Sequence, residues 1–181
     1  MRIVSGKHRG LVLYEFEAGN IRPTTDRVRE NIFNKIQFGV AGSRVLDLFC
    51  GTGAVSLEFL SRGAEIVISV DNNKNSTALI KKNFAKAKEK LNLIEVDFKQ
   101  ALQQLKGQKF DYIFLDPPYK EGFGEESLKL ISEFDMLEDD GMIIYEHLGE
   151  TKFNVPANME LVDRKKYGTI MVSYIGRISD D

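Results

Sequence analysis

The segment Arg44-Val45-Leu46-Asp47-Leu48-Phe49-Cys50-Gly51-Thr52-Gly53 decides the fold. Its first part, residues 44–49, is apolar and predicts a buried β-strand, and the two glycines after it permit a tight turn. The apolar residues 54–61 then predict a short helix, which Arg62-Gly63 ends. A strand, a glycine turn and a helix in this order are typical of the first unit of a doubly wound α/β sheet.

The same alternation continues along the chain. We expect further strands over residues 65–70, 93–96, 110–115 and 142–145, and helices over residues 74–91, 99–105 and 125–134. Repeated units of this kind predict a mostly parallel sheet with helices on its faces. Two β-rich runs, 159–162 and 169–175, predict an antiparallel C-terminal hairpin at the edge. The expected fold class is therefore α/β, a doubly wound Rossmann-like sheet with that hairpin.

The first 42 residues have a different pattern. Short β-like runs precede a helix for which Thr24 or Thr25 is a natural N-cap. Apolar side chains then recur at helical spacing, so one face of this helix should pack on the core; they are Val28, Ile32, Phe33 and Ile36. We interpret the chain as one domain, 1–181, in which residues 1–42 form a basic extension with a helix and residues 43–181 form the Rossmann-like core.

Composition narrows the class of protein. The 181 residues are 43% hydrophobic, contain one cysteine and have no apolar run of membrane-spanning length. These features and the polar start indicate a soluble, cytoplasmic protein without internal disulfides, and no metal site is expected. The net charge of −2 is uneven, because residues 1–44 contain eight Lys/Arg and four Asp/Glu. A basic arm on an acidic body favours local contact with phosphates, although chance clustering on a solvated face gives the same counts.

Acidic residues stand at the ends of the first three predicted strands. Asp47, Asp71 and Asp97 are therefore expected on one rim of the sheet, where ligands of such folds bind. Asp71 is placed to accept hydrogen bonds from ribose hydroxyls, and Asp97, beside the ring of Phe98, is placed near an adenine amino group. A dinucleotide is disfavoured, because Ser56 replaces the usual third glycine and Asp47 would repel a pyrophosphate. A ligand with an ammonium and a sulfonium suits Asp47 better, which indicates S-adenosylmethionine. The alternative is a generic turn with solvated acids.

The strand over residues 110–115 delivers Asp116-Pro117-Pro118-Tyr119 to the same rim. The prolines fix the backbone and lack N–H donors, so their carbonyl oxygens are available to a ligand. An exocyclic amino group must become more tetrahedral to attack a methyl sulfonium, and hydrogen bonds to Asp116 and to the Pro117 carbonyl would hold it so. Tyr119 would stack on an extruded base. The candidate catalytic residues are thus these four, and the alternative is a rigid turn with Tyr119 in the core.

Two long stretches resemble the amino-terminal signature of the RsmD family, bacterial 16S ribosomal RNA (guanine-N2)-methyltransferases. They are residues 2–10, Arg-Ile-Val-Ser-Gly-Lys-His-Arg-Gly, and residues 22–34, Arg-Pro-Thr-Thr-Asp-Arg-Val-Arg-Glu-Asn-Ile-Phe-Asn. The loop at 47–53, Ser61-Arg62-Gly63-Ala64, residues 116–119 and Tyr167-Gly168 extend the resemblance over nearly the whole chain. Asp-Pro-Pro-Tyr alone is shared with adenine methyltransferases. Cys50 and Thr52 stand where the family often has Ala and Ser.

The resemblance implies transfer of a methyl group from S-adenosylmethionine to N2 of one guanine in small-subunit ribosomal RNA. The candidate cofactor-binding residues are Asp47, Phe49, Gly51, Gly53, Asp71, Asn72, Asp97 and Phe98. The candidate RNA contacts are Lys7, Arg9, Arg22, Thr24, Arg27 and Arg29. Arg22 has an alternative role, in which it braces the cofactor loop.

Three functions stay open from the sequence. The first is the RNA guanine-N2 methyltransferase, acting as a monomer on ribosomal RNA, the small subunit or an assembly intermediate. The second is an adenine-N6 methyltransferase on DNA or RNA, against which the lack of a target-recognition domain counts. The third is a nucleic-acid-binding protein without catalysis, against which the intact Asp116 site counts.

Overall fold

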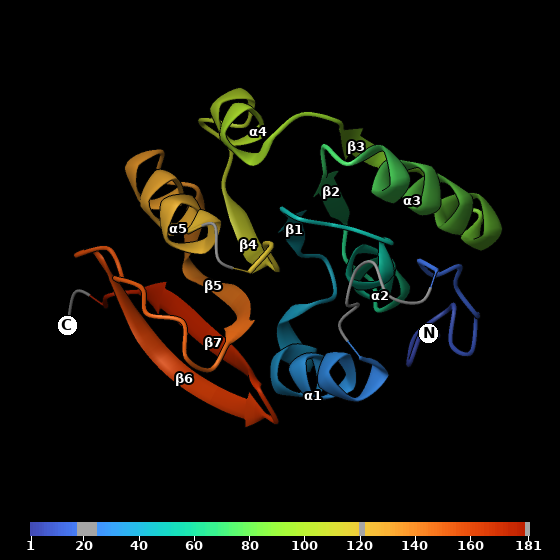
Figure 1. Ribbon diagram of the computed structural model, residues 1–181, viewed down its shortest axis with the longest axis horizontal. Coiled ribbons are helices and arrows are strands. Elements are labelled where there is room, and N and C mark those ends of the chain that lie inside the picture. Colours follow the sequence, from blue (N-terminus) through green and yellow to red (C-terminus); the bar gives the residue numbers. More distant parts are fainter. Residues whose placement is uncertain (18–24, 120–121, 180–181) are drawn as a thin grey trace.

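The computed structural model describes residues 1–17, 25–119 and 122–179. Their strands form one seven-stranded sheet in the order β3-β2-β1-β4-β5-β7-β6 (Figure 1). The strands are β1 (Arg44–Asp47), β2 (Ile66–Val70), β3 (Asn92–Ile94), β4 (Phe110–Leu115), β5 (Leu137–Leu148), β6 (Met159–Tyr167) and β7 (Ile170–Arg177). Neighbouring strands from β3 to β5 pair in parallel, and β7 lies antiparallel between β5 and β6. The predicted doubly wound sheet with an antiparallel C-terminal hairpin is confirmed.

Helices cover both faces of this sheet (Figure 1). They are α1 (Asp26–Ile36), α2 (Ala54–Ser61), α3 (Lys74–Ala87), α4 (Phe98–Gln104) and α5 (Phe123–Glu133), and the 3-10 helix η1 (Gln37–Gly39) follows α1. Helices α4 and α5 bury apolar side chains on one face, against residues such as Leu46 and Ile113. Helices α1 and α2 pack on the opposite face, against Val45 and Phe114. No helix in the described part of the chain has the length and apolar character needed to cross a membrane.

Helix α1 begins as the sequence predicts. The Thr25 side chain accepts a hydrogen bond of 3.2 Å from the Val28 backbone N–H, and the predicted apolar face is buried. Thr24, the other N-cap candidate, lies outside the described residues. The β-like runs of the first seventeen residues form only an isolated antiparallel bridge, between Arg2 and Val12. The segment is instead tied to α2, because Glu58 accepts hydrogen bonds from the backbone N–H groups of Val4 and Ser5.

Other predicted boundaries shift for identifiable reasons. Helix α3 ends at Ala87 rather than residue 91, because Lys88 adopts a left-handed conformation with φ of 56°. Strand β5 spans twelve residues rather than four, because β7 pairs with it from Met142 to Leu148 and β4 pairs with its first residue. The extension carries β5 past the carboxyl end of β4, so its last residues stand beside the rim that bears the candidate site.

Candidate active site

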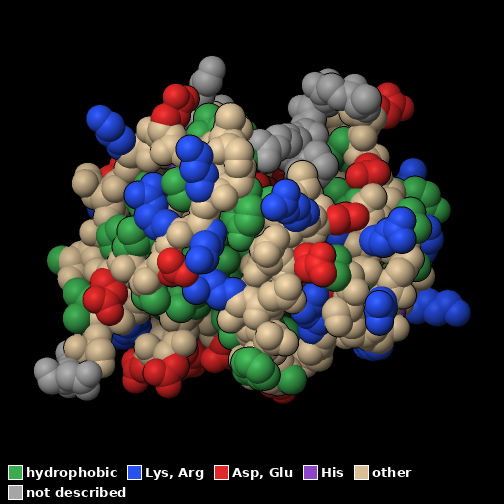
Figure 2. Space-filling model, turned by 90° about the horizontal axis from the view of Figure 1, so that it is seen from below, with side chains coloured by type: hydrophobic (Ala, Val, Ile, Leu, Met, Phe, Trp, Pro, Cys, Tyr) green, Lys and Arg blue, Asp and Glu red, His purple; other side chains and the backbone are tan. Residues whose placement is uncertain are grey.

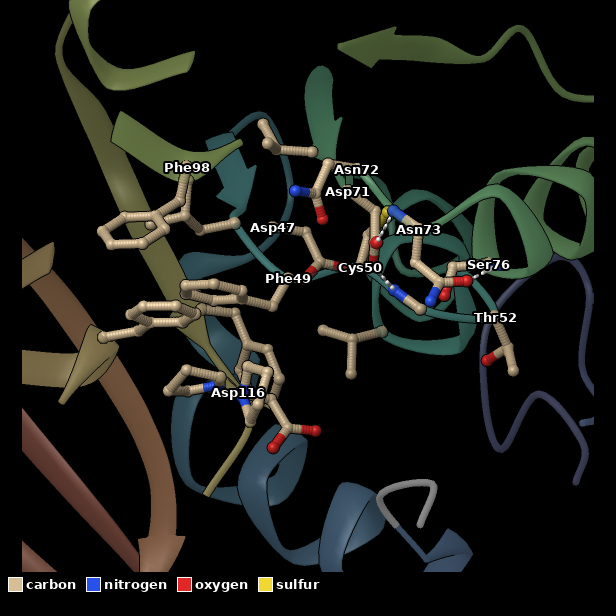
Figure 3. Close-up of a pocket in the computed structure, with 18 of the residues that line it drawn as sticks. Asp47, Phe49, Cys50, Thr52, Asp71, Asn72, Asn73, Ser76, Phe98 and Asp116 are labelled. Carbon is tan, nitrogen blue, oxygen red and sulfur yellow. Dashed lines mark hydrogen bonds between the residues drawn. The ribbon is translucent and has the colours of Figure 1, made fainter. Parts of the chain in front are cut away.

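A cavity of about 600 Å³ opens at the rim where strand order reverses between β1 and β4. It is the place that the fold predicts for a ligand. The cavity is lined by all four candidate catalytic residues and by seven of the eight candidate cofactor residues: Asp47, Phe49, Gly51, Asp71, Asn72, Asp97 and Phe98. The structure therefore brings together segments that are up to 72 positions apart in the sequence, from Asp47 to Tyr119 (Figure 3).

The turn after β1 is built around glycine. Gly51 has φ of 52°, and its backbone N–H donates a hydrogen bond of 3.0 Å to Asp71 Oδ2. The other oxygen, Asp71 Oδ1, accepts a 2.9 Å bond from the Asn73 N–H. Each carboxylate oxygen has two lone pairs, so both retain capacity for a ligand hydroxyl. Asp71 is thus held rigidly at the end of β2 in an orientation that suits two adjacent hydroxyls.

Gly53, the eighth candidate, does not line the cavity. It has φ of 84° and is the N-cap of α2, and a Cβ at this position would lie 2.5 Å from Ile80 Cγ1. Its missing side chain lets α2 and α3 approach closely and gives the turn its conformation. The structure thus assigns Gly53 a role in packing and turn geometry.

Asp47 is the most buried acid of the cavity, with 1% of its surface exposed. Its Oδ2 accepts a 2.7 Å hydrogen bond from the Ser56 hydroxyl, while Oδ1 has no hydrogen-bond partner among the described residues. Burial is the main cause that raises the pKa of Asp47 to about 7, and the nearby Asp71 charge adds to it. A buried carboxylate with an unsatisfied oxygen fits a cationic group, such as the ammonium of S-adenosylmethionine.

Aromatic rings form one wall of the cavity. The Phe98 ring lies 5.4 Å from that of Phe49 and 4.9 Å from that of Phe123, measured between centroids. Asp97 is the N-cap of α4, where its Oδ1 accepts hydrogen bonds from the N–H groups of Lys99 and Gln100. The capping bonds fix the carboxylate at the cavity edge. An apolar wall with one fixed acceptor fits a purine ring with an amino group.

Asp116 follows the last residue of β4. The pairing of β1 with β4 places Phe114 opposite Asp47, so both acids belong to one rim. Asp116 and Tyr119 are half-buried, Pro117 is buried and Pro118 is exposed. In the view of Figure 3, Phe49 lies between Asp47 and Asp116. The cavity therefore has a buried, acidic end at Asp47, where the sequence predicts the cofactor, and an end next to solvent at residues 116–119, where it predicts the methyl acceptor. We call them the cofactor end and the acceptor end.

Several lining residues were not predicted from the sequence. The main ones are Met1, Phe16, Asn73, Ser76, Val96, Lys99 and Phe123. Asn73 is the N-cap of α3, which its position before a helical run signals. Met1 and Phe16 reach the cavity only through tertiary packing of the N-terminal segment, for which the sequence has no local signal.

The candidate RNA contacts do not share one environment. Lys7 forms an ion pair of 2.5 Å with Glu89, and 61% of its side chain is exposed. Burial tends to raise the pKa of Glu89, but hydrogen bonds from His8 and Lys7 outweigh it and lower that pKa. Arg9 and Arg27 are exposed. Arg22 and Thr24 lie outside the described residues.

The prediction of Arg29 as an RNA contact is wrong. Its side chain is fully buried and pairs with Glu58, with 3.3 Å between Nε and Oε1, and with Asp26 at 3.0 Å. Arg29 also donates a hydrogen bond to the Arg2 carbonyl. Charge counting cannot distinguish this arginine from an exposed one, because the buried partner Glu58 lies 29 positions away in the sequence. Arg29 is a structural residue that joins α1, α2 and the N-terminal segment.

Comparison with known proteins gives a consistent result. Residues 1–176 match the family described as Conserved hypothetical protein 95. The chain is 40% identical to YlbH of Bacillus subtilis, over 93% of this chain and 94% of that one. It is 33% identical to Ribosomal RNA small subunit methyltransferase D of Escherichia coli, over 94% and 86%.

Solved structures agree. The structure of yhhF from Escherichia coli superposes with a TM-score of 0.89 at 30% identity, covering 99% of both chains. A conserved hypothetical protein of Streptococcus pyogenes gives a TM-score of 0.75 at 30% identity, over 83% of this chain and 96% of that one. With the cavity and these similarities together, the chain belongs to the family of Conserved hypothetical protein 95, the RsmD family of S-adenosylmethionine-dependent methyltransferases.

Proposed function

We propose that this enzyme transfers a methyl group to the exocyclic N2 of a guanine in small-subunit ribosomal RNA. One observation carries the proposal: Asp116 to Tyr119 line the same cavity as Asp47 and Asp71. The relative in Escherichia coli is named for ribosomal RNA of the small subunit, and the choice of guanine N2 follows from the family resemblance. In this proposal the enzyme acts as a monomer in the cytoplasm, on ribosomal RNA or on an assembling subunit.

The residues of the cofactor end would bind and orient S-adenosylmethionine. S-adenosylmethionine, when bound, supplies an electrophilic methyl group on its sulfonium. Asp47 would pair with the ammonium group, Asp71 would accept hydrogen bonds from the ribose hydroxyls, and the Phe49–Phe98 wall would pack against the adenine. With these contacts made, the reactive end of the cofactor would face Asp116, which lines the same cavity. Positioning of this kind lowers the barrier by removing the entropy cost of bringing the reactants together.

The acceptor end prepares the amino nitrogen. Asp116 and the Pro117 carbonyl accept hydrogen bonds from the two N–H groups, which withdraws the nitrogen lone pair from the ring and directs it at the methyl group. Asp116 does not have to be a strong base, because the amine proton becomes acidic only as the new N–C bond forms. Tyr119 stacks on the extruded base and holds its plane.

The direct test replaces Asp116 with Asn. We expect methyl incorporation from labelled cofactor into unmodified small-subunit RNA to fall by at least about 100-fold, a size typical of losing one group that stabilises a transition state. Cofactor affinity, measured by calorimetry, should stay within about threefold. Asp71→Asn is the matched control, because it should weaken cofactor binding first. Wild-type rates in Asp116→Asn would disprove the assigned chemistry.

The adenine-N6 reaction uses the same contacts with another base edge, since adenine also presents an exocyclic amino group. Nucleoside mass spectrometry of the methylated RNA separates the two, because N2-methylguanosine and N6-methyladenosine differ in mass. A product on adenine would overturn the guanine assignment and leave the amino-methyl chemistry intact.

A further inference from the structure

Basic side chains gather outside the cavity, on the C-terminal hairpin that the methyl-transfer site does not use. Strand β6 ends in Arg164-Lys165-Lys166-Tyr167, and the three basic side chains are exposed. Together with Arg27 of α1, they make no ion pair with any residue in the described ranges. In Figure 2, which views the molecule from below, Lys and Arg side chains lie close together left of the centre. We call Arg27, Arg164, Lys165 and Lys166 the hairpin surface.

Helix α1 packs on the face of β6 that carries Asp163, Lys165 and Tyr167, while Arg164 and Lys166 point to the opposite face of this edge strand. Lys35 Nζ of α1 lies 2.7 Å from Asp163 Oδ2 of β6, and it also lies 4.9 Å from the centre of the Tyr174 ring in β7. Burial raises the pKa of the Tyr167 phenol, and the charges of Arg27 and Lys35 oppose this rise. Arg27 therefore lies near the end of β6. Lys35 thus fixes the two elements together, and Arg27 and the hairpin cations remain available to a partner.

Strand register places this surface level with the methyl-transfer site. Leu115, the residue before Asp116, pairs with Tyr145, which pairs with Ser173, which pairs with Arg164. Lys166 is in line with His147, two residues further toward the rim. Strands lie about 4.8 Å apart, so the three steps from β4 to β6 span about 14 Å. The backbone of β6 at Arg164 therefore lies about 14 Å from the end of β4, measured across the sheet.

This distance fits a nucleic-acid strand that delivers its base to the cavity. Successive phosphates of a nucleic-acid strand lie a few ångström apart along its axis, ~3.4 Å in a DNA helix, so 14 Å corresponds to a few nucleotides. We propose that the hairpin surface binds backbone phosphates of the RNA a few nucleotides from the target guanine. The inference rests on the proposed function, since it presumes an RNA substrate. The sequence predicts RNA contacts in the N-terminal arm, but Lys7 and Arg29 there are paired within the protein. We therefore assign much of the RNA contact to the C-terminal hairpin.

A structural role competes with this one. Strand β6 is an edge of the sheet, and lysines on edge strands prevent pairing with another chain. That role predicts self-association when the charges are removed, and no change in the RNA affinity of the monomer. Phosphate binding predicts the reverse. Sedimentation and RNA titration of the same variant therefore separate the two roles.

The experiment uses the full chain with two probes, an unmodified transcript of small-subunit ribosomal RNA and small subunits reconstituted from it. The test variant is Arg164→Gln/Lys165→Gln/Lys166→Gln. The control, Lys82→Gln/Lys90→Gln/Lys129→Gln, removes the same charge from exposed lysines elsewhere. We expect the test variant to raise the Kd for RNA at least tenfold and to lower the slope of log K against log salt by about 2, since each lost phosphate contact removes ~0.7–0.9. The control should change the slope by less than about 0.5.

Kinetics complete the test. The test variant should raise KM for RNA, with kcat at saturating RNA and calorimetric cofactor affinity near wild type. If the test variant has the same salt slope as the control while the wild-type enzyme methylates RNA, the hairpin surface does not bind phosphates, and the proposed function is unaffected. Wild-type enzyme that binds cofactor but neither RNA probe overturns the proposed function, and this inference with it. Should the triple variant aggregate, Lys166→Gln alone should lower the slope by ~0.8, and Lys166→Arg should restore it.

Discussion

The Ser56 hydroxyl donates a 2.7 Å hydrogen bond to Asp47 Oδ2, and both side chains are buried, with Asp47 lining the cavity. Ser69 extends this contact, with 2.8 Å between its hydroxyl oxygen and that of Ser56. One oxygen of Asp47 is therefore fixed, while the other has no hydrogen-bond partner in the described part of the protein. Burial raises the pKa of this carboxyl to about 7. Asp47 therefore gains or loses its charge near neutral pH, and a cationic ligand beside it favours the charged form.

Cofactor affinity should therefore depend on pH. Below pH 7 Asp47 is mostly protonated and cannot pair with an ammonium group, and above pH 7 it is ionised. We expect the Kd for S-adenosylmethionine to tighten about tenfold between pH 5.5 and pH 7. Calorimetry in two buffers of different ionisation enthalpy should also detect proton release. Asp47→Asn should bind more weakly with a flat profile, and a flat profile in the wild type would contradict this role.

The same pKa has a consequence for stability. A carboxyl with a folded-state pKa above its unfolded value stabilises the fold at low pH, and that contribution is lost as pH rises from about 4 to about 7. Asp47→Asn should thus increase the free energy of unfolding of the cofactor-free protein. The gain should be about 2–3 kcal/mol larger at pH 8 than at pH 5. Denaturant unfolding at the two pH values measures it, and a gain that does not grow with pH would refute the pKa assignment.

Arg29 and Arg27 form a matched pair, two residues apart on α1, one buried and one exposed. Arg29→Ala leaves Glu58 buried with part of its partners missing, so the free energy of unfolding should fall by about 3 kcal/mol. Arg27→Ala should change it by less than about 0.5 kcal/mol. In RNA titrations the order reverses: Arg27→Ala lowers the salt slope by about 0.8 and Arg29→Ala leaves it unchanged. A fall of the salt slope in Arg29→Ala would show that Arg29 contacts RNA after all.

Gly53 and Gly107 separate close packing from backbone conformation. Both have positive φ, of 84° and 96°, but a Cβ at Gly53 would meet Ile80 at 2.5 Å and one at Gly107 would meet nothing within 4 Å. Gly107→Ala should therefore cost about 1 kcal/mol from the left-handed backbone alone. Gly53→Ala should cost about 1–3 kcal/mol more, because α2 and α3 must move apart. Equal losses in thermal unfolding would mean that the helices adjust freely.

The sequence predicts the core of the fold well for a physical reason. The strands β1 and β4 are buried on both faces, so they appear as continuous apolar runs, and each is followed by a glycine or proline turn. Strand β5 is predicted at a third of its length, because its first residues include Glu138, Asp139 and Asp140, which resemble a loop. Pairing of Leu137 with β4, and of residues 142–148 with β7, holds both ends of this stretch extended, and neither partner is near in the sequence.

Some residues of the site can also be predicted from the sequence, and others cannot. Acids at strand ends can be placed from the sequence, since topology alone brings Asp47, Asp71 and Asp116 to one rim. The third aromatic wall residue, Phe123, cannot, because it depends on the angle at which α5 meets the sheet. The burial of Arg29 cannot be predicted either, because the residue pattern of α1 does not show that Glu58 of α2 packs against Arg29. Long-range ion pairs and helix orientations are set by tertiary packing.

Nucleoside mass spectrometry tests the central claim most directly. Unmodified small-subunit ribosomal RNA, free and in reconstituted subunits, is incubated with the enzyme and S-adenosylmethionine, digested and compared with an Asp116→Asn reaction. The account predicts N2-methylguanosine in the wild-type digest and its loss in the variant. A wild-type digest without a methylated exocyclic amino group, or a product that persists in Asp116→Asn, would contradict it.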